Sequence, residues 1–71
     1  MKICYKKLWK LLIDKDMMKK DLGKKAKISS ASIAKLGKNE NVTTEILLKI
    51  CTALECDISD IMEIASDETV L

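Results

Sequence analysis

The stretch Lys19–Lys38, KKDLGKKAKISSASIAKLGK, decides the fold of this chain. Its apolar residues recur at i and i+4 before residue 28 and at i and i+3 after it, the spacing of two short amphipathic helices. Ile28 would fill a tight corner between them, and Ser29 offers the side-chain oxygen that starts a helix. The residues that would face inward are Leu22, Ala26, Ile28, Ile33 and Leu36. We therefore predict a helix-turn-helix.

Helical periodicity also covers most of the remaining chain. Thr43 would cap one further helix and Ser59 another, and Met1–Cys4 is the one place where a short extended segment fits. The 71 residues, without proline, suit a single all-α domain over 1–71, a compact five-helix bundle around the helix-turn-helix. The expected helices lie at about residues 5–15, 19–25, 30–37, 44–54 and 60–64, with 66–71 a frayed tail.

Charge is divided sharply along the chain. Residues 1–41 hold twelve lysines against four acidic residues, a balance of +8, whereas residues 42–71 hold one lysine against seven acidic residues, a balance of −6. A strongly basic half suggests a polyanionic partner, with the acidic half turned away from it. The alternative is a lysine-rich surface that meets only solvent. No apolar run approaches the roughly 20 residues that span a membrane, and no signal peptide is evident, so we expect a cytoplasmic protein.

Neither metal nor catalytic chemistry is supported by the residue types. The three cysteines show no C-x-x-C spacing, and the chain has no histidine for a mixed zinc site. We interpret Cys4, Cys51 and Cys56 as small buried apolar residues in a reducing compartment. The sequence contains no glycine-rich phosphate loop and no nucleophile beside a base. We therefore expect no enzyme, no metal, no cofactor and no small-molecule ligand.

The inward residues of Lys19–Lys38, with Gly23 added, resemble the helix-turn-helix of Cro/CI-type (Xre-like) DNA-binding domains. The likeness continues through NVTT at residues 41–44 and DISDI at residues 57–61, which resemble the starts of the family's last two helices. It covers roughly residues 5–64. The resemblance implies a lambda-repressor-like fold whose third helix enters the major groove, and hence a sequence-specific DNA-binding transcriptional regulator.

Three positions depart from the family's usual pattern. Met18 stands where a threonine or serine usually caps the second helix, Gly23 replaces a usual alanine, and Lys27 replaces the usual glycine of the corner. A left-handed backbone at Lys27 would cost roughly 1 kcal/mol, and the lost cap about as much. Gly37, after the last apolar residue, suits a C-terminal cap. These departures affect the predicted stability rather than the predicted fold.

The DNA-facing residues follow from the direction of the third helix. At 100° per residue, Ile33 and Leu36 mark its buried side. Its outward residues can contact thymine methyl groups, several base edges or guanine; they are Ser30, Ala31, Ala34 and Lys35. The resemblance implies that phosphates are held by the start of the second helix and the end of the third with its loop, here Lys19, Lys38, Asn39 and Asn41. Because the chain has no arginine, affinity should rest on lysine–phosphate contacts with limited base readout.

One such domain offers few contacts to DNA, and members of this fold generally bind two half-sites as dimers. We therefore expect a homodimer on double-stranded DNA, paired through the last helix, the tail or the N-terminal residues. The apolar residues Ile61, Met62 and Ile64 motivate this hypothesis. An alternative from another class is a protein-interaction module of the same fold, an antitoxin-like or anti-repressor partner, which the small outward face and acidic second half favour.

Overall fold

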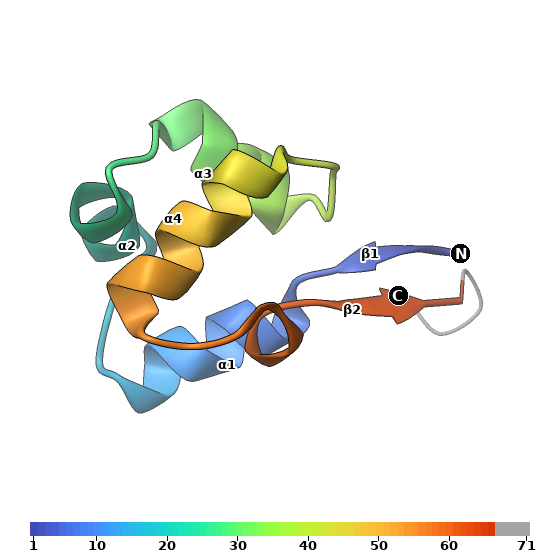
Figure 1. Cartoon of the computed structure of the whole chain (residues 1–71), viewed down its shortest axis with the longest axis horizontal. Coiled ribbons are helices and arrows are strands. Elements are labelled where there is room, and N and C mark those ends of the chain that lie inside the picture. Colours follow the sequence, from blue (N-terminus) through green and yellow to red (C-terminus); the bar gives the residue numbers. More distant parts are fainter. Residues whose placement is uncertain (67–71) are drawn as a thin grey trace.

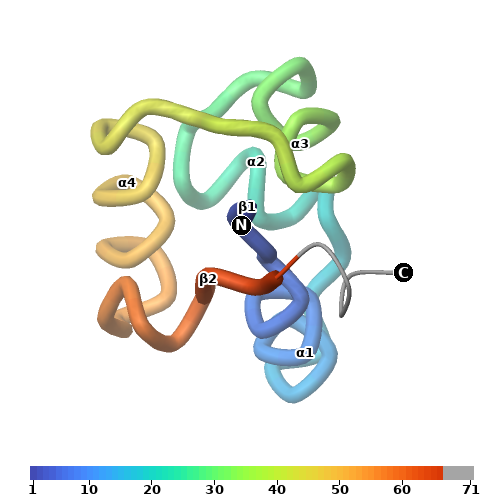
Figure 2. Tube along the Cα trace, turned by 90° about the vertical axis from the view of Figure 1, so that its right-hand side faces the viewer, coloured from blue at the N-terminus to red at the C-terminus, as the bar shows by residue number. Residues whose placement is uncertain are grey.

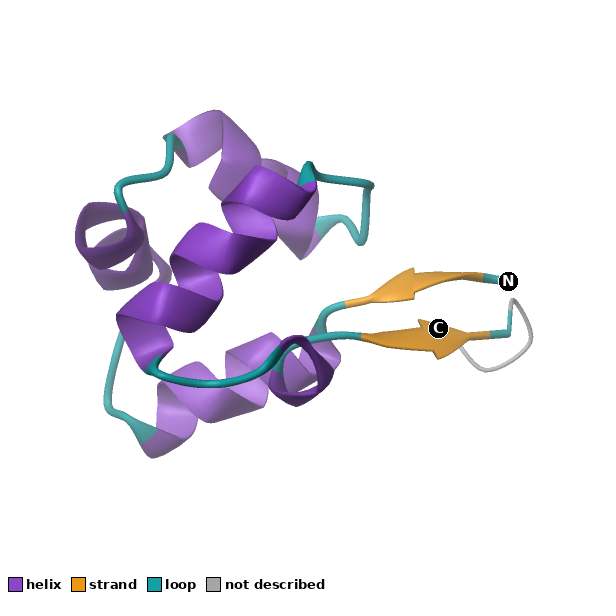
Figure 3. Cartoon of the chain, in the orientation of Figure 1, coloured by secondary structure: helices purple, strands orange, loops and turns teal. Residues whose placement is uncertain are grey.

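Four α-helices and a two-stranded ribbon make up residues 1–66, the part of the chain that the computed structural model describes (Figures 1 and 3). The ribbon projects from the helices at the end opposite α2 (Figure 1). In chain order the elements are β1 (Lys2–Cys4), α1 (Lys6–Asp14), α2 (Lys19–Ala26), α3 (Ser30–Gly37), α4 (Thr44–Leu54), the 3-10 helix η1 (Ile58–Asp60) and β2 (Glu63–Ala65). None of the helices within residues 1–66 has the length and apolarity to cross a membrane.

The core lies where the apolar stripes of the helices meet. Helix α4 packs against α2, and η1 packs against both α1 and α4; Figure 2 shows α4 on one side of the molecule, with α2 and α3 opposite. The predicted inward residues of Lys19–Lys38 are all buried except Ile33, which is half-buried. Ile13, near the end of α1, is 73% exposed. The buried residues are Tyr5, Leu8, Leu12, Leu22, Ala26, Ile28, Leu36, Leu47, Ile50, Leu54 and Ile61.

The predicted helix at residues 60–64 is wrong, and with it the all-α, five-helix description. The chain makes one 3-10 turn at η1 and then runs as β2, antiparallel to β1, with Ile3 opposite Ile64. Asp57, not Ser59, caps the turn: its carboxylate accepts the N–H of Ile58 at 2.7 Å. The carboxylate of Asp60 in turn accepts the N–H of Asp57 at 2.9 Å. This reciprocal pair closes a single turn, after which β1 supplies backbone partners.

The N-terminal segment is extended over Lys2–Cys4, within the Met1–Cys4 stretch where the sequence allowed it. The predicted tail at 66–71 falls outside the described residues except for Ser66, which is exposed. Helix α1 is one residue shorter at each end than the predicted 5–15, and α2 is one residue longer than 19–25. Helices α3 and α4 have the predicted bounds. Their caps are also confirmed, since Ser29 Oγ accepts the N–H of Ser32 and Thr43 Oγ1 accepts the N–H of Ile46.

All four α-helices of residues 1–66 are followed by a left-handed residue that is not glycine. These residues have φ between 52° and 58° and are Asp16, Lys27, Asn39 and Glu55. The N–H of the next residue then bonds to the carbonyl five residues earlier, as in a Schellman motif. Lys27 confirms the expected left-handed corner. The cap predicted at Gly37 is wrong, because Gly37 stays within α3 and Asn39 takes the left-handed conformation.

Candidate nucleic-acid interface

The helix-turn-helix consists of α2, the connection Lys27–Ser29 and α3. Ile28 is buried in the corner, and Leu36 anchors α3 in the core. Gly23 faces the corner: a Cβ placed there would lie 3.5 Å from the Ile28 carbonyl oxygen and 3.8 Å from Ile33 Cγ1. These are ordinary van der Waals distances, so the corner accepts a small side chain at position 23 and does not require glycine.

The start of α2 lacks the usual hydroxyl cap but is still partly capped. The Asp21 carboxylate accepts the N–H of Met18 at 2.9 Å, which is one half of a capping box. The Asp21 charge also lies in the first turn, where the helix dipole favours an anion. The cap loss expected at Met18 is therefore offset in part by Asp21, three residues further on.

The outward side of α3 is open to a partner. All four residues predicted to face bases are exposed: Ser30, Ala31, Ala34 and Lys35. The buried Leu36 and half-buried Ile33 lie on the opposite side. The face therefore combines two methyl groups, one hydroxyl and one ammonium, which is a small set of groups for direct base contacts.

Asn39 has a structural role that the sequence did not reveal. Its side-chain oxygen accepts the backbone N–H of Tyr5 at 3.0 Å, and the Tyr5 hydroxyl donates to the Glu40 carbonyl at 2.9 Å. Tyr5 thus ties the connection between α3 and α4 to the start of α1, and Asn39 is half-buried. Only the amide NH₂ of Asn39 remains for a phosphate, whereas Asn41 is exposed.

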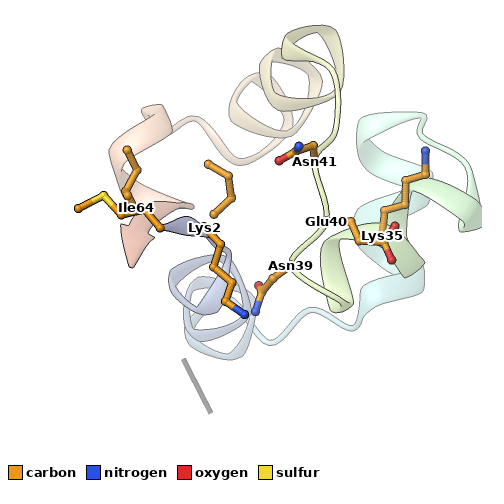
Figure 4. Close-up of a pocket in the computed structure, with 8 residues that line it drawn as sticks. Lys2, Lys35, Asn39, Glu40, Asn41 and Ile64 are labelled. Atoms are coloured by element: carbon orange, nitrogen blue, oxygen red, sulfur yellow. The ribbon is translucent and has the colours of Figure 1, made fainter. Parts of the chain in front are cut away.

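An open hollow of about 750 Å³ extends from this connection to the ribbon (Figure 4). In Figure 4, Lys2 of β1 lies on one side and Lys35 of α3 on the other, with Asn39, Glu40 and Asn41 between them. Lys2 was not among the predicted DNA contacts. Its position at the N-terminus gave no sequence signal, because the ribbon that brings it here pairs residues 2–4 with residues 63–65.

Lys19 lies between three helices. Its ammonium is 4.5 Å from the centroid of the Trp9 ring, a cation–π contact from α2 to α1. The same nitrogen is 3.8 Å from where a Cβ of Gly37 would be, close to the C-terminal end of α3 and its negative dipole end. Trp9 is half-buried against the core, and it also orients the first lysine of the helix-turn-helix. Lys38, by contrast, is exposed at the end of α3.

Two lysines absent from the predicted contacts lie beside the predicted site. Lys20 and Lys24 line a hollow of about 390 Å³ between α2 and α3 together with Lys19 and Ser30. Their i, i+4 spacing on the outer side of α2 is a signal that sequence reasoning could have used. The helix-turn-helix thus gathers several ammonium groups around the N-terminal end of α3.

The acidic residues gather elsewhere. Another hollow, beside α4 and η1, is lined by Glu55, Asp57 and Asp60. The one lysine after residue 41, Lys49, pairs with Glu45 at 3.5 Å on the exposed side of α4. Some N-terminal lysines serve packing instead, since Lys7 Nζ donates to the Ser59 carbonyl at 3.1 Å and holds η1 to α1. Lysines of α2 therefore gather beside α3, and the acidic cluster gathers beside α4 and η1, where Lys7, Lys10 and Lys15 lie next to Glu55 and Asp60.

Comparison with known proteins agrees with this geometry. Residues 7–67 match the family described as the Cro/C1-type HTH DNA-binding domain. The chain is also similar to a crystal structure of the transcriptional regulator VanUg, with 53% sequence identity, a TM-score of 0.84, and coverage of 87% of this chain and 83% of that chain. The search of curated proteins gave no match. The chain belongs to the Cro/C1-type helix-turn-helix DNA-binding domains, a family of transcriptional regulators and not of enzymes.

Proposed function

We propose that this regulator recognises specific DNA sites by placing α3 in the major groove. The observation that carries the proposal is the exposed side of α3, where the four predicted base-facing residues lie together (Ser30, Ala31, Ala34 and Lys35). Ser30 hydrogen-bonds to base edges, the alanines contact thymine methyl groups, and Lys35 donates to guanine. The set is small, so DNA shape and deformability contribute to site preference.

Lysine–phosphate contacts supply the larger share of affinity in this proposal. Lys19, Lys38, Asn39 and Asn41 contact the backbone on either side of the groove, as the family resemblance implies. The N-terminal N–H groups of α2 add a positive dipole end beside Lys19. Each neutralised phosphate releases counterions, so binding weakens as salt rises, with a slope set by the number of lysines engaged.

Selection of bound fragments from random double-stranded DNA tests this proposal. We expect enrichment of a two-fold symmetric motif whose half-sites lie about 10 base pairs apart. Enrichment that persists at physiological salt indicates base or shape readout beyond phosphate attraction. Absence of any enriched motif would contradict sequence-specific binding and favour the alternative, a protein-interaction module of the same fold.

We further propose that two copies bind together, paired through the β1–β2 ribbon. The interface suggested by Ile61, Met62 and Ile64 needs revision, because Ile61 is fully buried in the core and Met62 is half-buried. Ile64, on β2, is 67% exposed, and Met1, adjoining β1, is 91% exposed. The ribbon therefore carries apolar surface at the end of the molecule opposite α2 (Figure 1).

Sedimentation of Ile64→Ser and Ile13→Ser variants tests the pairing. Both residues are exposed isoleucines, and Ile13 lies on α1, away from the ribbon. We expect wild type and Ile13→Ser to be dimeric at high micromolar protein and Ile64→Ser to shift towards monomer. A monomeric wild type under these conditions, or equal dimerisation of all three proteins, would refute a ribbon interface.

A further inference from the structure

The two cysteines at the end of α4 are in contact with each other. Cys51 lies in the last turn of α4, Cys56 directly follows the left-handed residue Glu55, and the N–H of Cys56 bonds to the Cys51 carbonyl at 3.0 Å. This is the Schellman position in which the two flanking side chains normally make an apolar contact. Here that position is taken by two thiols, which lie close enough for each to shift the pKa of the other.

Both thiols are reachable from solvent. Each is half-buried, and both line the hollow of about 580 Å³ beside α4 and η1. The expectation that all three cysteines are simply buried is therefore wrong. Cys4 is the third cysteine; it lies in β1 opposite Glu63 and does not line this hollow. The three thiols are free, so the fold leaves Cys51 and Cys56 reduced and adjacent.

We propose that Cys51 and Cys56 form a reversible disulfide by exchange with a small disulfide such as oxidised glutathione. The bond needs Cα atoms roughly 4.4–6.8 Å apart, and the backbone hydrogen bond between the two residues already holds their main chains together. Closure would join the last turn of α4 to the residue before Asp57, the cap of η1. This site is independent of the proposed DNA contacts, all of which lie outside the hollow.

The chemistry proceeds in two exchanges. The Cys51 thiolate attacks one sulfur of glutathione disulfide, a mixed disulfide forms on Cys51, and one glutathione thiolate leaves. The Cys56 thiolate then attacks Cys51 Sγ, the Cys51–Cys56 bond forms, and the second glutathione leaves. The two thiol protons pass to the two released glutathiones. The protein dithiol is thus oxidised by two electrons, and glutathione disulfide is reduced to two thiols.

Either thiol can attack first, because both are half-buried and line the same hollow; the scheme is written with Cys51 attacking. Burial raises the pKa of both, that of Cys56 to about 11, and the hydrogen bond between them raises the pKa of Cys56 while lowering that of Cys51. Asp60 also disfavours both thiolates. Because only the thiolate reacts, the exchange is slow at neutral pH and accelerates about tenfold per pH unit while the thiolate fraction is small.

The test is incubation with oxidised glutathione, alkylation of remaining thiols and measurement of intact mass. We expect a product lighter by two hydrogen atoms with one alkylated cysteine, Cys4. A protease that cleaves after glutamate cuts at Glu55, between the two cysteines, so its peptides stay joined until reduced. The product should keep its helical circular dichroism. Closure that involves Cys4, or closure that abolishes the helical signal, would overturn the proposal.

Variants separate the two steps. Cys4→Ser should still lose two hydrogen atoms, whereas Cys56→Ser should retain one glutathione on Cys51, because no resolving thiol is left. Cys51→Ser should likewise retain one glutathione on Cys56. A wild-type protein that keeps stable glutathione on Cys51, or that fails to react while free glutathione exchanges under the same conditions, would also overturn the proposal.

Discussion

At the scale of single residues, the helix ends store backbone strain. Four non-glycine residues adopt positive φ after the four α-helices of residues 1–66. A residue with a Cβ pays roughly 1 kcal/mol for this conformation, whereas glycine adopts it readily. The corner residue Lys27 is the clearest example, with φ 58° and ψ 48° and an exposed side chain. The sequence predicted this strain, because the family pattern has glycine at the position that Lys27 occupies.

Lys27→Gly should stabilise the protein by about 1 kcal/mol. The matched control is Lys24→Gly, which removes an exposed lysine inside α2, where glycine costs about 1 kcal/mol. Urea unfolding followed by circular dichroism would measure both. Equal destabilisation by the two variants would show that the left-handed conformation of Lys27 does not lower the stability of the protein.

Gly23→Ala should also stabilise the protein, by about 1 kcal/mol, because alanine is the better helix former. Its Cβ would meet the Ile28 carbonyl oxygen at 3.5 Å and Ile33 Cγ1 at 3.8 Å, which requires no rearrangement. The same urea measurement applies. A loss of stability would show that the corner is tighter than the structure indicates.

At the scale of elements, local signals in the sequence predicted the four α-helices. They failed for the last segment, whose structure depends on pairing with a strand far away in the sequence. Helices α3 and α4 have the predicted bounds because Ser29 and Thr43 cap them and apolar stripes follow. The segment at 60–64 offered an equally apolar pattern, but it forms β2 because β1, some 60 residues earlier, pairs with it. A three-residue strand has too few positions for alternation to distinguish it from a helical turn.

Tyr5 links elements that are distant in sequence, and alkaline pH should weaken this link. Burial raises the pKa of Tyr5 above its ordinary value of 10.0. Ionisation is therefore harder in the folded state, so stability is intact below pH 10 and falls as pH rises through the folded pKa. Tyr5→Phe should cost about 1 kcal/mol at neutral pH by removing the hydroxyl bonded to the Glu40 carbonyl.

Urea unfolding at a series of pH values would separate this tyrosine from the cysteines. Raised thiol pKa values at Cys51 and Cys56 act in the same direction, so the wild-type loss has more than one source. The expected result is a shallower alkaline loss in Tyr5→Phe than in wild type. Parallel curves for the two proteins would contradict a contribution from Tyr5.

At the scale of the whole molecule, the sequence predicted which residues of α3 are exposed better than it predicted which polar groups of the proposed phosphate contacts are already bonded within the protein. The base-facing set follows from the direction of one helix, and all four residues are exposed. Lys19 and Asn39 were predicted as phosphate contacts from family positions. Their partners, Trp9 and Tyr5, come from the start of the chain and could not be inferred from local spacing.

The basic and acidic residues also lie in different places in the folded molecule. Lys19, Lys20 and Lys24 of α2 line a hollow beside α3, whereas Glu55, Asp57 and Asp60 lie beside α4 and η1. A strongly asymmetric charge distribution orients a protein as it approaches a polyanion. We therefore expect the lysines of the helix-turn-helix to meet DNA, with the Glu55, Asp57 and Asp60 cluster turned towards solvent.

The most direct test of α3 as the DNA-reading element compares two charge reversals on the selected DNA site. Lys35→Glu lies on the outward side of α3, and Lys49→Glu lies on α4 beside Glu45, so both change the net charge equally. Fluorescence anisotropy should show binding weakened about tenfold or more by Lys35→Glu, as loss of a base or phosphate contact implies. Lys49→Glu should bind with nearly the affinity of wild type, and both variants should keep the helical circular dichroism signal of wild type. Equal affinities for the two variants would contradict the account.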